Sequence, residues 1–257
     1  MLASAPNIGY GAAHVKAPQP TAAPDCLLAF LPAAMTDPKQ QRIAMVESQV
    51  RPSDVTDRRI LRAMLEIPRE VYAPEGVRSV AYMDAALPVT PRRSVRPGRY
   101  LLPPRTLAKL VQAAEVAPDS LVLDVGCATG YSSALLARLA RAVVALEVDS
   151  ALAEQAEITL RKQGVVNVVV LQGPLAAGAP THAPFDAILL NGSVAQAPLH
   201  LLEQLKERGR LVAVLAEGNF GGAQVWRRAG KGFDAIRVFD GGAEPLPGFA
   251  RQAAFTL

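Results

Sequence analysis

Two acidic side chains and two glycines in the middle of the chain have the types and spacing to hold a ligand. Asp124 ends an apolar run of strand length, Gly126 and Gly130 follow in one turn, and Glu147 ends the next apolar run. The glycines let the backbone adopt positive φ and leave no Cβ in the way of a ligand. Glu147 lies 21 residues after Gly126 (147 minus 126), where a carboxylate accepts hydrogen bonds from two vicinal ribose hydroxyls. The spacing therefore predicts a nucleoside site.

Two phosphate-binding loops compete with this interpretation. The dinucleotide loop G-x-G-x-x-G needs a glycine where Ala128 stands. The phosphate loop needs Gly-Lys followed by Ser or Thr, whereas Gly230-Lys231 continues into Gly232. Neither fits well, so a nucleoside without phosphates is favoured, and a strand–turn–helix unit that only packs is the remaining alternative.

The stretch Asp124–Tyr131 resembles the D/E-x-G-x-G-x-G-Y loop of S-adenosylmethionine-dependent methyltransferases. Three earlier blocks, Met45–Arg51, Ile67–Glu70 and Ala81–Pro88, are similar, in this order, to blocks of the protein-L-isoaspartate O-methyltransferase family. The resemblance covers roughly residues 40 to 215. It implies S-adenosylmethionine-dependent methyl transfer to the carboxylate of L-isoaspartyl residues, a protein repair reaction, by a cytoplasmic monomer without nucleic-acid or membrane partners. A methyltransferase with another acceptor and a non-catalytic cofactor-binding or scaffold protein stay open.

The resemblance also implies which residues meet the cofactor. The glycine loop is expected to hold the methionine part, Glu147 the ribose, and Gln172 the adenine amino group through its amide oxygen. Asn191 is expected at the carboxyl end of a strand, where a plain Asn-Gly turn is an equal alternative. The full set is Asp124, Gly126, Cys127, Ala128, Thr129, Gly130, Tyr131, Glu147, Val148, Gln172, Gly173 and Asn191.

A basic segment and Asp84 are expected to border the acceptor. Arg96 and Arg99 are the candidates for holding a substrate carboxylate with two hydrogen bonds, and a solvated basic loop is the alternative. The prolines and glycine of the segment predict a loop. Its arginines are Arg92, Arg93, Arg96, Arg99 and Arg105.

The chain departs from the family at Leu102, which stands where the family's Thr-x-Ser-Gln-Pro block has its active-site serine. Leucine neither donates nor accepts a hydrogen bond. An acceptor carboxylate is already ionised at neutral pH, so its methylation needs no general base. Losing one positioning hydrogen bond is expected to cost about 1–3 kcal/mol, or about 10- to 100-fold in rate. The sequence thus predicts weakened activity or another acceptor.

Apolar periodicity predicts an α/β protein with a doubly wound, mostly parallel seven-stranded sheet, an N-terminal helical lobe and a C-terminal antiparallel hairpin. We expect a disordered extension over 1–36, a helical substrate lobe over 37–118 and a cofactor-binding domain over 119–257, with Met35 as a candidate translation start. The predicted helices are 38–50, 57–67, 103–116, 132–139, 150–163 and 199–205. The predicted strands are 121–125, 143–147, 167–171 (a buried strand), 185–192 (a strand and its exit turn), 209–215, 223–229 and 233–239.

Composition narrows the functional classes. The 257 residues are 50% hydrophobic with a net charge of +4, far below the charge of a typical nucleic-acid binder. The longest apolar runs are too short to span a membrane. Cys26 and Cys127 indicate a reducing compartment rather than a disulfide framework. His14, His182 and His200 lack ligand spacing, so no metal site is expected.

Overall fold

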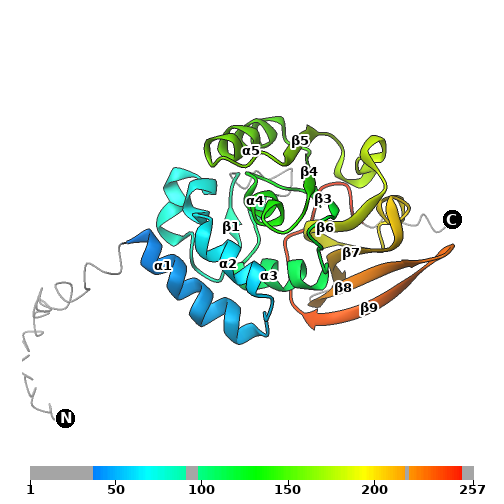
Figure 1. The fold of residues 1–257 in the computed structure, drawn as a ribbon, viewed down its shortest axis with the longest axis horizontal. Coiled ribbons are helices and arrows are strands. Elements are labelled where there is room, and N and C mark those ends of the chain that lie inside the picture. Colours follow the sequence, from blue (N-terminus) through cyan, green and yellow to red (C-terminus); the bar gives the residue numbers. More distant parts are fainter. Residues whose placement is uncertain (1–36, 91–97, 218–219, 251–257) are drawn as a thin grey trace, which may run out of the picture. The chain divides into compact units, whose positions relative to one another are not determined.

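Seven strands form one sheet in the order β5-β4-β3-β6-β7-β8-β9 (Figure 1). The first five of these pair in parallel, and β8 and β9 add antiparallel pairs at one edge, as the sequence predicts. The strands are β3 Leu121–Val125, β4 Ala142–Glu147, β5 Val168–Gln172, β6 Phe185–Val194, β7 Leu205–Glu217, β8 Phe220–Ala229 and β9 Gly232–Asp240.

The computed structural model describes residues 37–90, 98–217 and 220–250. All of them belong to one compact unit, residues 34–257. The predicted extension 1–36 and the candidate start Met35 lie outside the described residues. The predicted division between residues 118 and 119 stays a prediction. Residues on both sides of it belong to one hydrophobic cluster.

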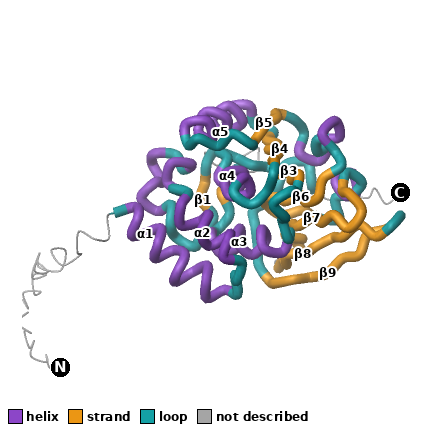
Figure 2. Tube along the Cα trace, viewed as in Figure 1, coloured by secondary structure: helices purple, strands orange, loops and turns teal. Residues whose placement is uncertain are grey.

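Each face of the sheet has its own hydrophobic cluster, because side chains alternate along a strand. Val122 faces the cluster of the main helices, whereas Leu123 and Val125 face the opposite one. In Figure 2 the larger helices lie to the left of β7, β8 and β9. They are α1 Pro38–Met45, α2 Arg58–Glu66, α3 Pro104–Ala113, α4 Tyr131–Ala137 and α5 Ser150–Lys162. The short α6, Leu199–Leu202, contributes to the opposite cluster, so the sheet is covered on both faces.

Helix ends follow local signals in the sequence. The Asp57 side chain accepts a hydrogen bond from the Arg59 N–H at the start of α2, and Asp149 caps α5 in the same way. Gly164 follows α5 with φ 69°. None of the helices in the described ranges is both long enough and apolar enough to cross a membrane.

Short helical turns and a small sheet complete the N-terminal part. The turns are Val46–Val50, Arg51–Ser53, Arg69–Tyr72, Glu75–Val80, and, later in the chain, Leu175–Ala177 and Pro180–His182. The small sheet pairs β1, Leu87–Pro88, with β2, Tyr100–Leu101, in antiparallel fashion. Periodicity did not predict this pair because each strand has only two residues. It matters because it fixes the backbone that enters and leaves Arg99.

Two strand predictions need correction. The predicted buried strand is β5, which is the outermost strand of the sheet, and its Val169 is 54% exposed. The predicted turn at Asn191-Gly192 is instead part of β6, which runs on to Val194. Past the glycine, Ser193 and Val194 pair with Val214 and Leu215 of β7. A later segment adds to this: the Ser193 N–H donates to Glu244 O (2.8 Å), and the Leu246 N–H donates to Ser193 O (2.9 Å). Both contacts extend the strand past the glycine.

Candidate cofactor and acceptor site

Asp124 is the anchor of the glycine loop. Its carboxylate is fully buried and accepts hydrogen bonds from Ser132 Oγ (2.7 Å), Ser133 Oγ (2.5 Å) and Asn191 Nδ2 (2.6 Å). Burial raises the pKa of the Asp124 carboxyl group, and these three donors oppose that rise. One side chain therefore ties the carboxyl ends of β3 and β6 to the first turn of α4.

The loop backbone takes the conformation expected from its glycines. Gly126 and Gly130 have φ angles of 72° and 94°. Ala128 also lies in the left-handed region (φ 53°), which is unusual for a residue with a Cβ. The Ala128 N–H donates to Glu147 Oε2 at 2.8 Å, and this hydrogen bond stabilises that conformation. The loop thus presents main chain, rather than side chains, at the carboxyl edge of the sheet.

Three predicted cofactor residues support the loop from behind. Cys127 is buried beside β4 and α5, in a cluster with Ala145 and Ala156. The Thr129 hydroxyl donates to Tyr72 O (2.5 Å), and the Tyr131 ring packs edge-on against the Tyr72 ring at 5.6 Å between centroids. Thr129 and Tyr131 thus join the loop to the N-terminal helical part, whereas Cys127 joins it to β4 and α5.

Arg69 completes that junction, and sequence reasoning did not single it out. Its side chain is fully buried, with Nε donating to Ala81 O (2.8 Å) and Nη2 donating to Leu102 O (2.8 Å). The guanidinium carbon lies 4.8 Å from the centroid of the Tyr131 ring. Burial lowers the pKa of Arg69. The only sequence signal was its place in the block Ile67–Glu70.

Glu147, the predicted ribose acceptor, is fully buried and holds the guanidinium of Arg99. Arg99 donates from Nε to Oε1 (3.1 Å) and from Nη2 to Oε2 (2.9 Å). Oε1 also accepts from the N–H groups of Val148 (2.9 Å) and Asp149 (3.3 Å). The Arg99 Nη2 group donates to Gly126 O as well, at 2.8 Å. Residues 48 positions apart in the chain thus form one buried ion pair.

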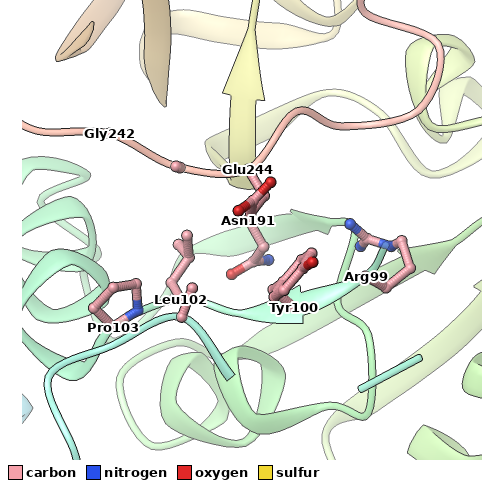
Figure 3. A pocket seen from close by; sticks show the side chains of 9 residues that line it. Arg99, Tyr100, Leu102, Pro103, Asn191, Gly242 and Glu244 are labelled. Atoms are coloured by element: carbon pink, nitrogen blue, oxygen red, sulfur yellow. The ribbon is translucent and has the colours of Figure 1, made fainter. Parts of the chain in front are cut away.

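A cavity of about 330 Å³ adjoins this ion pair. In Figure 3, Tyr100 and Leu102 line one side, and Glu244 in the C-terminal segment lies across from them beside Asn191. Arg99 borders the cavity as well as the ribose position. Leu102, at the position of the family's serine, is therefore part of the cavity wall. The full lining is Ala86, Arg99, Tyr100, Leu102, Pro103, Asn191, Gly242, Ala243 and Glu244.

The predicted acceptor residues are only partly brought together. The Asp84 carboxylate pairs with Arg105 Nη2 (3.1 Å) and accepts from the Arg105 N–H (3.4 Å) at the start of α3. Arg105 thus lies in α3, within the predicted helix 103–116, and not in the predicted basic loop with the other arginines. Arg96 lies outside the described residues, with Arg92 and Arg93. Arg99 uses Nε and Nη2 for Glu147 and Gly126 O, so these donors are not free for a substrate carboxylate.

The predicted adenine side lies next to Glu147. Gln172 is opposite Glu147 in the pairing of β4 and β5, and its residue is exposed. The Gly173 N–H donates to Glu147 O at 2.9 Å. A role for Gln172, Gly173 and Val148 in holding adenine stays a prediction. Across the described ranges, no cluster of three His, Cys, Asp or Glu residues is arranged to hold a metal ion.

Comparison with known families decides the affiliation. The family model for protein-L-isoaspartate(D-aspartate) O-methyltransferase matches residues 40–240. The chain belongs to the protein-L-isoaspartate O-methyltransferase family. Its relatives of that name include proteins from Herpetosiphon aurantiacus (38% identical over 179 residues, 70% of this chain and 77% of the relative) and a Synechococcus species (40% over 187 residues, 72% and 74%).

Solved structures of protein-L-isoaspartate O-methyltransferases share the fold. One superposes with a TM-score of 0.71 at 23% identity, covering 80% of this chain and 66% of the other, slightly less than two thirds. Another, from Plasmodium falciparum in complex with S-adenosyl-L-homocysteine, has a TM-score of 0.64 at 20% identity and covers 78% and 95%. The doubly wound, mostly parallel sheet with its antiparallel end is thus the fold of this methyltransferase family.

Proposed function

We propose that this protein transfers a methyl group from S-adenosylmethionine to the carboxylate of L-isoaspartyl residues in damaged proteins. The observation that carries the proposal is the meeting of three neighbouring strands at one site: Asp124 of β3 holds the glycine loop, Glu147 ends β4 beside it, and Asn191 of β6 borders the adjoining cavity. Family membership supports the choice of acceptor.

The residues present fit the cofactor in two parts. The backbone of Gly126–Gly130 offers a surface without protruding side chains for the methionine part. Glu147 ends β4 at the same edge, and Gln172 lies next to it for the adenine. The carboxylate oxygens of Glu147 become available to ribose hydroxyls once the Arg99 side chain leaves. When bound, the cofactor supplies a methyl group on a positively charged sulfur.

The chain itself has to position the acceptor and exclude water. A carboxylate acceptor is ionised near neutral pH, so no side chain has to remove a proton. The cavity has a mainly apolar wall formed by Leu102, Pro103 and Tyr100. An apolar wall keeps water away from the acceptor carboxylate, whose hydration would slow the transfer. Orientation of the carboxylate against the methyl group then supplies most of the rate gain.

The test is transfer of labelled methyl to a peptide with one isoaspartyl bond, with its normal aspartyl twin as control. We expect base-labile label on the isoaspartyl peptide alone, and none with the Glu147→Ala variant. Label on neither peptide, from protein that demonstrably binds S-adenosyl-L-homocysteine, would remove this acceptor from consideration.

A second candidate is methylation of another acceptor by the same site. Leu102 favours it, because no side-chain hydroxyl stands at the position where the family has its serine. Equal labelling of the two peptide twins, or labelling of other proteins in a cell extract only, would support this candidate over isoaspartyl repair.

Location and assembly belong to the same proposal. We propose a cytoplasmic location, which the unpaired, buried thiol of Cys127 supports, and a monomeric state. Cell fractionation tests the location. Light scattering during gel filtration tests the assembly, and the proposal expects a mass near the 27.2 kDa of one chain.

A further inference from the structure

The guanidinium of Arg99 occupies two of the positions predicted for the cofactor. It pairs with the carboxylate of Glu147, and it lies against the main chain of Gly126. A Cβ added to Gly126 would come within 2.7 Å of Arg99 Nη2. The space that glycine leaves free for a ligand is therefore filled by a side chain of the same protein.

Glu147 has no acceptor capacity left over for a ribose. A carboxylate offers about four lone-pair sites. In the described part of the chain, Glu147 already accepts from five donors: two atoms of Arg99 and the N–H groups of Ala128, Val148 and Asp149. The three N–H groups belong to the glycine loop and to the turn between β4 and α5, which build the site. Only the Arg99 side chain can leave without rebuilding them.

The backbone of Arg99 is held in place, so an exchange concerns its side chain alone. Its N–H donates to Thr90 Oγ1 (2.9 Å), and its carbonyl accepts from the Val89 N–H (2.9 Å). The same side chain borders the cavity of about 330 Å³ next to the ribose position. The guanidinium therefore has a cavity beside it to move into, and Figure 3 shows Arg99 among the lining residues with Tyr100 and Leu102.

We propose that Arg99 is a built-in competitor for the ribose position, so that binding of an S-adenosyl compound requires exchange of the guanidinium on Glu147 for ribose hydroxyls. The inference rests on the cofactor part of the proposed function and makes Arg99 a determinant of cofactor affinity. Charge-assisted, two-pronged contacts are stronger than contacts from neutral hydroxyls, so the competition lowers the affinity of the protein for the cofactor.

The test is calorimetric titration of S-adenosyl-L-homocysteine into the full-length protein and its Arg99→Gln variant. Glutamine cannot form a charged pair with Glu147. We therefore expect the variant to bind S-adenosyl-L-homocysteine with a dissociation constant lower than that of the wild type by about tenfold or more. Arg237→Gln is the matched control, because Arg237 pairs with Glu217 and Asp240 on β7 and β9, away from Glu147. Its affinity is expected to equal that of the wild type.

A second variant keeps the test valid if Arg99→Gln folds poorly. Arg99→Lys retains the charge but loses the planar, two-pronged geometry, and we expect an intermediate gain in affinity. The melting temperature of each protein is measured with and without S-adenosyl-L-homocysteine, and the ligand should raise it most for Arg99→Gln.

The outcomes separate this inference from the proposed acceptor. Unchanged or weaker binding by Arg99→Gln and Arg99→Lys would overturn the inference, since Arg99 would then be a structural or cofactor-holding residue. Absence of binding by every variant would overturn it together with the cofactor assignment. Tighter binding by Arg99→Gln without methylation of isoaspartyl peptide would support the inference and remove only the proposed acceptor.

Discussion

The glycine loop and the ribose position lie at the same edge of the sheet but are held by different kinds of contact. Asp124 is held by neutral donors, two serine hydroxyls and one amide, which come from α4 and β6. Glu147 is held in part by a charged side chain that comes from outside the large sheet. The first arrangement is part of the scaffold, because its donors lie on a helix and a strand of the main fold. The second is reversible, because one long side chain can leave while the backbone stays.

The largest effect is expected from Asp124→Ala. The change leaves Ser132, Ser133 and Asn191 without their buried acceptor, at roughly 1–3 kcal/mol for each group. We expect a loss of about 4–6 kcal/mol in the free energy of unfolding, measured by urea denaturation, and loss of cofactor binding. Asp57→Ala, which removes a helix cap and a partly exposed ion pair with Arg59, should cost about 1 kcal/mol. Equal costs for the two variants would show that Asp124 is no clamp.

The ion pair of Glu147 and Arg99 is tested by the variant Glu147→Ala, alone and combined with Arg99→Gln. The single change leaves a buried guanidinium without its partner, which is expected to cost about 3 kcal/mol in unfolding free energy. The double variant removes the stranded charge and should be more stable than the single variant. Additive losses in this double-mutant cycle would contradict a coupled ion pair.

A smaller effect is expected at the acceptor cavity. Leu102→Ser restores a hydroxyl at the family's position and should raise kcat/KM for an isoaspartyl peptide about 10-fold, equivalent to about 1.4 kcal/mol. Leu102→Ala is the control, because it opens the same space without a hydroxyl. An equal rate for serine and alanine would mean that space, rather than the hydrogen bond, limits the reaction.

The smallest effect is expected for alkylation of Cys127, which tests whether the glycine loop stays closed. Burial raises the pKa of the Cys127 thiol well above its ordinary value. The neutral thiol is therefore favoured in the folded protein, and alkylation should stay slow as the pH rises from about 7 to about 9. Mass spectrometry of the labelled peptide measures it. Rapid labelling of the folded wild type would show that the loop opens, whereas Asp124→Ala is expected to label quickly.

Some features of the site followed from the sequence by itself. The glycine loop, the acidic residue 21 positions later (147 minus 126) and the parallel sheet were predicted because each depends on neighbours a few residues apart: strand alternation, positive φ at glycine and helix caps. The blocks that resemble the family were also visible, so the affiliation needed no coordinates. Leu102 was recognised as a departure, but not as part of a cavity wall.

Other features were decided by the tertiary structure alone. The sequence suggested Arg99 for a substrate carboxylate, yet packing of the small β1–β2 sheet brings it to Glu147, 48 positions along the chain. Arg69 became buried under Tyr131, and β6 ran past Gly192, because distant segments pack on them. A charge or a turn residue has no preferred partner in local sequence. Its partner is decided by the fold, because burial removes water and the group must then pair with the nearest complementary group of the protein.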